Sequence, residues 1–385
     1  MLKCASIYTC EVDNPDVALV EIQAQLDEKI SLLRHSVGVI MCHTEFITTG
    51  VLEHICAHLP FDVVGVTTAS QAVNDEVSEL VLTIFVMTSS DVEFITGATG
   101  SLEEQAGQEI KAAYDKCSAG VEQEPQLVLV FPPFGIHPVD MYVNEWTSML
   151  SRTPVFGTPA IDDTATFSEC ETIYNGKHSK TSMPFILCYG NINPRFLIAT
   201  FSESNAVTSK AVVTKSVGNC VFEINNAAAY KYYEDKGIVD SVPLTPFMIE
   251  SVKRQDYDGV PVIYAHTTFT DEGAEIFYGG VEEGSTITLL KYEPDDIVSA
   301  AKQKMELVNE MSDINGVLLF SCAIRRFVLL GVNKPMQELQ SVRDTLRPGI
   351  PFMMGYAGGE ICPTSIRDGV PVNRFHNYSL IILVI

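Results

Sequence analysis

Short continuous runs of apolar residues alternate along the chain with stretches in which apolar side chains recur every three or four positions. Runs of roughly four to eight apolar residues are typical of strands buried on both faces, whereas the longer period predicts helices with one face toward a core. The first helical stripe runs from Leu19 to Leu33 behind Asn14-Pro15-Asp16, which predicts an N-terminal cap. The next elements expected are a strand at 37–42, a helix at 51–59 and strands at 61–68 and 80–87.

The same order of elements returns twice. Ser101 and Glu104 predict a capping box for a connecting helix. The second copy then has a strand at 127–131, a helix at 142–150 and strands at 154–158 and 184–189. The third has a strand at 316–320, a helix at 336–346 and strands at 350–354 and 379–385. Gly65, Gly157 and Gly355 occupy matching positions near the ends of the second strands, where glycine permits close approach of another backbone. Three copies of one unit indicate an ancient duplication.

A strand joined through a helix to another strand predicts a parallel crossover, and apolar strands predict sheets covered on both faces. The expected fold is therefore α/β, with mixed sheets and two lobes built from repeated strand-helix-strand-strand units. The polar stretch at 201–205 predicts a boundary that divides the chain into domains 1–203 and 204–385. Between the second and third copies we expect a strand pair at 212–221, followed by a short helix capped by Asn225-Asn226. A loop-rich stretch at 243–261 comes next. We then expect two strands within 276–290 and a helix after Pro294-Asp295.

Composition narrows the choice of compartment and partner. The net charge of −24 repels phosphate backbones and anionic lipids, which argues against nucleic acid and membranes as partners. No apolar run approaches the roughly 20 residues that span a bilayer, and the N-terminus lacks the apolar core of a signal peptide. The 10 cysteines show no CxxC pair, so we expect reduced thiols in a cytoplasmic protein, without a disulfide framework or a zinc site. Nothing in the sequence indicates the oligomeric state.

Polar side chains gather near the strand ends of the third copy, and ligands in open α/β sheets bind beyond the carboxyl ends of strands. The candidate ligand-binding residues are Cys322, Arg325, Tyr356, Glu360, His376 and Asn377. Arg325 can receive a carboxylate through two donors, and Glu360 can receive an amine. Asn377 offers a donor and an acceptor, and His376 a neutral hydrogen-bonding partner. The alternative is that Arg325 and Glu360 pair with each other to hold a turn while Asn377 satisfies backbone groups.

The sequence resembles that of FIST proteins over nearly its full length. Phe320-Ser321-Cys322-Ala323-Ile324-Arg325 is similar to the family's SCxxR segment, and 355–361 is similar to its aromatic-x-x-Gly-Glu-Ile turn. His376-Asn377-Tyr378-Ser379 resembles the terminal His-Asn-x-Ser/Thr. In the N-terminal half, 64–69 resembles a Val-Gly-Cys-Thr-Thr-Ala turn, although Ser70-Gln71 replaces the usual Gly-Glu.

The resemblance implies a FIST N-terminal and a FIST C-terminal domain in a sensory protein of signal transduction. It implies a small-molecule ligand, with an amino acid or similar small carboxylate as the proposed class. Because the sequence closes on a strand at Ile385, we expect a separate signalling protein to carry the output.

Two alternatives remain open. Some FIST proteins are described as haem sensors of nitric oxide, and His43 or His376 could supply the axial ligand. His54 and His58 have metal-chelating spacing but fall off the apolar stripe of their helix, which predicts a solvated face. Cys322, His376 and Glu360 are also the residue types of a cysteine-dependent enzyme. No GxSxG, Walker or HExxH motif accompanies them, so we assign no catalytic residue and expect neither cofactor nor metal.

Overall fold

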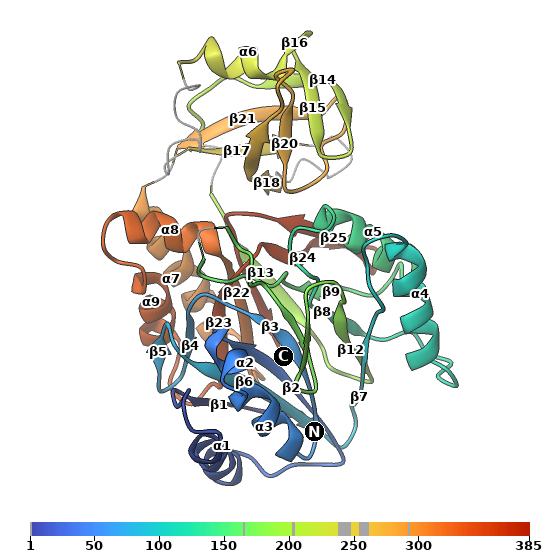
Figure 1. The fold of residues 1–385 in the computed structure, drawn as a ribbon, viewed down its shortest axis with the longest axis vertical. Helices are drawn as coiled ribbons and strands as arrows, with labels where there is room; N and C mark the ends of the chain where they lie inside the picture. Colours follow the sequence, from blue (N-terminus) through green and yellow to red (C-terminus); the bar gives the residue numbers. More distant parts are fainter. Residues whose placement is uncertain (1, 165, 202–204, 238–247, 254–261, 292) are drawn as a thin grey trace.

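The computed structural model (Figure 1) describes residues 2–164, 166–201, 205–237, 248–253, 262–291 and 293–385. An α/β body carries a β-rich insert at one end, formed by the described residues between 205 and 291. The domain boundary predicted after residue 203 and most of the loop-rich stretch predicted at 243–261 lie outside the described residues. The division into 1–203 and 204–385 therefore stays a prediction.

The described strands of the body form three six-stranded sheets. The first has the order β1 (Leu2–Thr9), β6 (Leu82–Ser89), β2 (His35–Cys42), β3 (Asp62–Thr67), β10 (Thr172–Tyr174), β11 (Lys177–Ser179). The second is β25 (Val370–His376), β24 (Glu360–Arg367), β9 (Val155–Gly157), β8 (Leu127–Val130), β12 (Pro184–Tyr189), β7 (Glu93–Ala98). The third is β13 (Arg195–Ala199), β26 (Leu380–Val384), β22 (Val317–Cys322), β23 (Phe352–Ala357), β4 (Gln71–Val73), β5 (Val77–Ser78).

Each sheet is built around one copy of the repeated unit. The first and second strands of each copy pair in parallel, as β2 with β3, β8 with β9 and β22 with β23. The closing strands β6, β12 and β26 pair antiparallel on the other side of the first strand. The predicted α/β fold, with mixed sheets and repeated strand-helix-strand-strand units, is confirmed.

A hairpin follows the second strand of each copy and pairs in the sheet of a different copy. The β4–β5 hairpin follows β3 but pairs with β23, and the β10–β11 hairpin follows β9 but pairs with β3. The β24–β25 hairpin follows β23 and pairs with β9. This cyclic exchange of hairpins ties the three copies into one body. The sequence did not predict this exchange. Strand β23 continues past Gly355 to Ala357, and the β24–β25 hairpin begins at Glu360.

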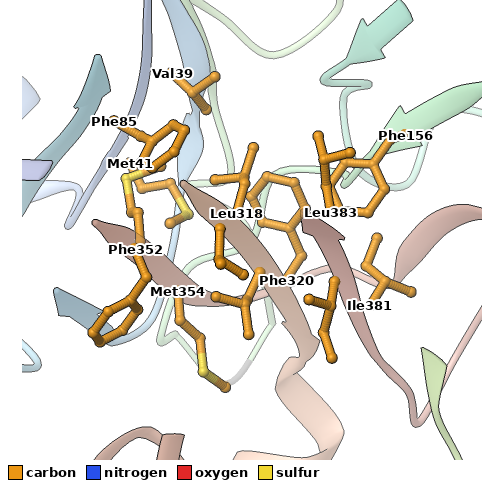
Figure 2. Packing of buried hydrophobic residues seen from close by; sticks show 14 of the residues in the cluster. Val39, Met41, Phe85, Phe156, Leu318, Phe320, Phe352, Met354, Ile381 and Leu383 are labelled. Carbon is orange, nitrogen blue, oxygen red and sulfur yellow. The ribbon is translucent and has the colours of Figure 1, made fainter. Parts of the chain in front are cut away.

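The inner faces of the three sheets share one hydrophobic core. Figure 2 shows Met41 and Phe85 of the first sheet close to Leu318 and Phe320 of the third, and the core also contains Phe156 of the second. The rings of Phe156 and Phe320 lie 5.5 Å apart between centroids. Because side chains of all three copies fill this space together, the copies are expected to lose their packing together.

Helices cover the outer faces of the sheets, so the prediction of sheets covered on both faces is confirmed. Helices α1 (Pro15–Lys29) and α3 (Val51–His58) pack on the first sheet, and α2 (Glu45–Thr48) precedes α3. Helices α4 (Ala106–Cys117) and α5 (Val139–Met149) pack on the second. Helices α7 (Pro294–Glu310) and α9 (Gln337–Thr345) contribute buried residues on the third. No described helix combines the length and apolarity needed to cross a membrane.

The sequence predicts the start of one helix correctly and that of another wrongly. The Asn14 side chain caps α1 by accepting from the backbone of Asp16 and Val17, as predicted. The predicted capping box at Ser101 is wrong, because the Ser101 hydroxyl bonds the Glu103 side chain and α4 begins only at Ala106.

The predicted cap at Asn225-Asn226 is also wrong. Both residues have positive φ, 54° and 63°, in the turn between β15 (Cys220–Ile224) and β16 (Ala227–Ala228). Asparagine tolerates this left-handed conformation, which explains its presence in a turn rather than at a helix start. Helix α6 (Ala229–Glu234) begins after Ala228.

The insert contains the remaining described sheet. Its strands run in the order β18 (Val262–Tyr264), β17 (Met248–Lys253), β21 (Thr286–Lys291), β14 (Ala211–Val217), β15, β20 (Glu275–Phe277), β19 (His266–Phe269), with β16 beside β15. It contacts the body where Tyr264 stacks on Phe375 and where the Gly280 backbone donates to Asp140. These contacts bring the insert to the same end of the body as the carboxyl ends of β22 and β23 (Figure 1).

The matching glycines mark close backbone approaches in the first two copies, as predicted. A Cβ atom on Gly65 would lie 1.7 Å from the carbonyl oxygen of Ile40, and one on Gly157 would lie 1.8 Å from that of Val130. At Gly355 the neighbour is instead the Met41 sulfur, at 2.6 Å. In the first two copies the parallel strand pair therefore leaves no room for a side chain.

We expect Gly65→Ala to lower the free energy of unfolding by about 3 kcal/mol or more, because backbone of β2 must move to admit the methyl group. Gly331→Ala is the control, since a Cβ there meets nothing within 4 Å. Chemical denaturation measures both variants. A Gly65→Ala loss no larger than that of the control would contradict the close approach.

Candidate functional site

The loops that follow the three second strands bond to one another at the carboxyl ends of the sheets. The Ala69 backbone donates to the carbonyl of Tyr356 at 3.3 Å, that of Ile161 to Thr67 at 3.1 Å, and that of Gly358 to Pro159 at 3.1 Å. These three hydrogen bonds form a closed set, called the loop ring below. It fixes the backbone from which the candidate residues extend.

A small pocket opens beside the loop ring, with a cavity volume of about 30 Å³. It is lined by Phe134, Ile161, Phe167, Tyr278, Cys322, Ala323, Ile324, Phe327, Ala357, Gly358 and Asn377. These residues come from the loops after β8, β9 and β23, from the end of β22, from the insert and from the helix that follows β22. The pocket thus lies where ligands were expected, beyond the carboxyl ends of parallel strands.

Helix α8 (Ala323–Gly331) begins directly after β22 and forms one wall of the pocket. Ile324 and Phe327 are half-buried, three residues apart on one helix face, and both line the pocket. Arg325, Val328 and Leu329 are buried. The sequence pattern does not indicate this helix, because its apolar run continues that of β22 and two arginines interrupt the helical period.

Arg325 is fully buried and its guanidinium is held by the protein. Nη2 and Nε donate to Oε1 of Glu338 at 2.6 and 3.1 Å, and Nη1 and Nη2 donate to the carbonyls of Tyr378 and Ile297. Burial acts to lower the pKa of Arg325, but the Glu338 carboxylate outweighs it and the pKa is raised. The alternative of an Arg325–Glu360 ion pair is wrong, because Glu338 of α9 is the partner.

Glu338 was missed because it lies in the polar part of a helix where charge is ordinarily solvated. In the structure it is fully buried, and its Oε2 also accepts from the Ser321 hydroxyl at 3.0 Å. The positive charge of Arg325 is therefore balanced inside the core. Its predicted role in receiving a ligand carboxylate stays a prediction, and Arg325 is not among the residues that line the pocket.

Glu360 begins β24 and is also fully buried. One carboxyl oxygen, Oε2, accepts from the Ser379 backbone at 3.1 Å, and the other, Oε1, has no partner of hydrogen-bonding geometry. Burial raises the pKa of Glu360 well above its usual value, although the Ser379 backbone and Arg325 oppose the shift. Burial and the neighbouring Glu360 also raise the pKa of the Cys322 thiol. In both groups burial thus favours the uncharged form.

Asn377 joins the pocket to the insert. Its backbone donates to the carbonyl of Ile263 at 2.8 Å, and its side-chain Oδ1 accepts from the Ala265 backbone at 3.0 Å. Both partners belong to the segment that contains β18. The predicted alternative that Asn377 satisfies backbone groups is thus correct for Oδ1, whereas Nδ2 has no hydrogen-bond partner among the described residues.

Tyr356 and His376 are buried and do not line the pocket. Burial and the nearby Glu338 carboxylate raise the pKa of Tyr356. Burial lowers the pKa of His376 to about 4, so its ring is neutral at neutral pH, as predicted, and Nε2 lies 3.3 Å from the carbonyl of Cys362. Among the six candidates, Cys322 and Asn377 line the pocket and the other four, all buried, do not.

The arrangement does not favour a thiol nucleophile. An activated cysteine needs a lowered pKa and a base within hydrogen-bond reach. Burial gives Cys322 the opposite shift, and in the described part of the chain no hydrogen bond joins it to His376. Thus the geometry supports binding by this cluster better than covalent catalysis.

Four aromatic residues line the pocket, and no sequence pattern links them because they lie far apart in the chain. The ring centroids of Phe134 lie 5.6 Å from Phe167 and 5.8 Å from Tyr278, and those of Phe167 and Phe327 lie 5.9 Å apart. Phe167 also has a positive φ of 52°, and Tyr378, next to Asn377, has one of 57°. The other described non-glycine residues with positive φ are all Asn or Asp, so the two strained bulky residues both lie at this site.

The other histidine candidates lie elsewhere. Nε2 of His43 lies 3.1 Å from Asp163, and Nε2 of His54 lies 3.1 Å from Asp16. Within the described residues, no three His, Cys, Asp or Glu side chains are grouped so that they could hold a metal ion. Neither His43 nor His376 lines the pocket. The haem alternative stays a prediction.

Comparison with known proteins gives two family matches. The model of the FIST N domain matches residues 36–227, and that of the FIST C domain matches residues 227–363. Among proteins with curated descriptions, none matches this sequence. A solved structure described as "Cyanuric acid hydrolase: evolutionary innovation by structural concatenation" is similar over 100% of this chain and 98% of that chain, with 8% sequence identity and a TM-score of 0.36.

We expect Arg325→Met to lower the free energy of unfolding by about 3–5 kcal/mol, because it leaves the Glu338 carboxylate buried without its partner. The double variant Arg325→Met/Glu338→Leu removes both charges and should recover at least half of that loss. Urea denaturation measures all three proteins. Near-wild-type stability of the single variant would show that the ion pair does not hold α8 in place.

We expect Tyr278→Ala to raise the rate at which iodoacetamide labels Cys322 at least tenfold, because Tyr278 is the insert residue that covers the pocket lined by this thiol. Tyr230→Ala, which changes an exposed tyrosine of the insert, should leave the rate unchanged. Peptide mass spectrometry measures labelling at Cys322 and at Cys188, a buried thiol of β12 that reports global opening. Equal acceleration at both cysteines would contradict a local effect.

Proposed function

We propose, for a chain that belongs to the FIST family, that it is a sensory protein whose small ligand occupies the pocket between β22, β23 and α8. FIST domains are small-ligand-binding sensory domains in signal transduction. The observation that carries the proposal is the position of the pocket. It lies at the carboxyl ends of two parallel strands, and the residues of the family's two C-terminal strand-end motifs, Cys322 and Asn377, line it.

The groups around the pocket support ligand binding in a second way. The buried Oε1 of Glu360 has no partner of hydrogen-bonding geometry, and buried polar groups in native proteins are ordinarily satisfied. The strained backbones of Phe167 and Tyr378 carry a cost of about 1–3 kcal/mol each, which is typical of functional sites. Because this strain lowers the stability of the folded state, its presence at both residues supports a functional role for the site.

The expected setting is the cytosol, with a separate signalling protein as output. All 10 cysteines are free in the structure, and free thiols are typical of a reducing compartment. The family resemblance implies an amino acid or similar small carboxylate as ligand, and compounds of that class belong in any screen. The insert supports communication with a partner, because Asn377 and Tyr278 connect the pocket to its surface-exposed sheet.

A thermal-shift screen of amino acids, small carboxylates and small uncharged amides tests the proposal. A ligand at a hundred times its Kd stabilises the native state by about 2.7 kcal/mol, which raises the midpoint measurably. We expect Ile324→Trp to abolish the shift by filling the pocket, whereas Leu330→Trp, on the exposed side of the same helix, should keep it. A shift that survives in Ile324→Trp would place the ligand elsewhere.

A further inference from the structure

Strand β1 lies at the edge of the first sheet, where its ladder partner is β6. Backbone groups of successive residues in an antiparallel strand point alternately to its two sides. The amide and the carbonyl of Tyr8 both bond the Gln25 side chain. The carbonyl of Ser6 accepts from Nζ of Lys29. Tyr8 and Ser6 therefore face away from β6, and by the same alternation so does Cys4.

Helix α1 covers only part of this open edge. Its side chains supply the partners of Tyr8 and Ser6, and the helix ends at Lys29. The outward amide and carbonyl of Cys4 form no hydrogen bond among the described residues. Leu2 has the same orientation and likewise lacks partners in the described part of the chain. The open part of β1 thus presents donors and acceptors at the spacing that an added strand requires.

This open part of β1 is the floor of a groove. Three adjoining cavities, with volumes of about 530, 470 and 320 Å³, follow one another along it. Leu2 lines both the first and the second, and Cys4 lines both the second and the third. The Lys29–Asp75 ion pair, at 2.7 Å, lines the third at the covered end of the strand. The continuous space is called the edge groove below, and β1 and α1 lie at the end of the body opposite to the insert (Figure 1).

The edge groove has a wall on each face of the first sheet. Residues 28–31, at the end of α1, form the outer wall, because α1 packs on the outer face. The loops at 312–315 and 349–351 form the inner wall, where Ile350 packs in the core that the three sheets share. Because the edge is recessed between these walls, it admits a single extended segment and not the edge of another folded sheet.

The charges along the edge groove favour a basic segment. The carboxylates of Glu28 and Asp313 line it and form no ion pair in the part of the chain that the structure describes. On the opposite side of the balance, Lys3 is exposed, and Arg195 donates to the carbonyls of Ser312 and Asp313. The whole chain has a net charge of −24, which attracts cationic partners from a distance.

We propose that the edge groove binds an extended, basic segment of a partner protein, which joins the first sheet as a strand beside β1. Its backbone pairs with the outward groups of Cys4 and Leu2, and its cationic side chains meet Glu28 and Asp313. Strand addition of this kind obtains affinity from main-chain hydrogen bonds and specificity from alternate side chains. The inference goes beyond the proposed function and needs no ligand in the pocket beside α8.

A library of random ten-residue peptides displayed on phage, selected on the immobilised full chain, supplies the probes. The enriched peptides are synthesised, and fluorescence polarisation gives the Kd of each. We expect enriched sequences to carry a net positive charge and to bind more weakly as the salt concentration rises. A selection that enriches no peptide, or that enriches acidic peptides, would overturn the inference.

Cys4→Pro tests the pairing, because proline lacks the outward amide and its ring projects into the groove, while the β1–β6 ladder keeps its hydrogen bonds. Cys4→Ala is the matched control, since it removes the same thiol and keeps the amide. We expect the Kd of the enriched peptides to rise at least tenfold in Cys4→Pro and to stay within threefold of wild type in Cys4→Ala. Equal affinity in the two variants would contradict the strand pairing.

Ser31→Trp keeps the inference testable if Cys4→Pro fails to fold. Ser31 is exposed and lines the outer wall, so a tryptophan there obstructs the groove. Gln23→Trp, on the exposed side of α1, is its control. We expect at least tenfold weaker peptide binding in Ser31→Trp and no change in Gln23→Trp. A wild-type dimer in sedimentation velocity that Ser31→Trp converts to monomers would assign the edge to a second copy and overturn the inference.

Glu28→Gln/Asp313→Asn tests the charge, and asparagine tolerates the positive φ of 54° at residue 313. We expect at least a fivefold loss of affinity for the enriched peptides. Glu122→Gln/Glu124→Gln, which neutralises two exposed carboxylates of another loop, should stay within twofold of wild type. An equal loss in both double variants would show that net charge alone attracts the peptides, and would overturn the assignment to the groove. None of these results bears on the thermal-shift screen, so the proposed function stands or falls separately.

Discussion

The loop ring at the carboxyl ends of β3, β9 and β23 is the constraint on which the rest of the structure depends. Each of its three hydrogen bonds joins the loops of two different copies of the repeated unit. The hairpins that leave these loops pair with strands of other copies, and the inner faces of the sheets share one core. A copy therefore obtains neither its strand pairing nor its packing from its own residues alone. We expect unfolding of the body to be cooperative across all three copies.

Much of the body could be predicted from the sequence because its signals are local. Continuous apolar runs identified β2, β8 and β22, and the repeated glycines identified the second strand of each copy. The exchange of hairpins could not be predicted, since pairing between β4 and β23 is decided by residues more than 250 positions apart. Helix α8 was missed for a different reason, as its apolar residues continue the run of β22 without a turn residue between them.

At the candidate site, too, local sequence motifs identified residues, whereas contacts between residues far apart in the sequence could not be predicted. Sequence motifs correctly drew attention to Cys322 and Asn377, which line the pocket, and to the buried Arg325 and Glu360. The suggested pairing of Arg325 with Glu360 is wrong, because Arg325 pairs with Glu338. Composition alone cannot distinguish this buried carboxylate on the polar side of α9 from a solvated one. The core thus contains one balanced ion pair, Arg325 with Glu338, and one carboxyl group, Glu360, whose pKa burial raises well above its usual value.

The cyclic exchange of hairpins has a consequence for how such a body can arise. A single strand-helix-strand-strand unit, synthesised alone, would present the open edge of its second strand and a hairpin with nowhere to attach. Three separate molecules of that kind satisfy one another's edges in the same way as three segments of one polypeptide do. The topology is thus that of a closed trimer of such units joined in one polypeptide, and the pocket lined by Cys322 and Asn377 lies at the end of the third unit.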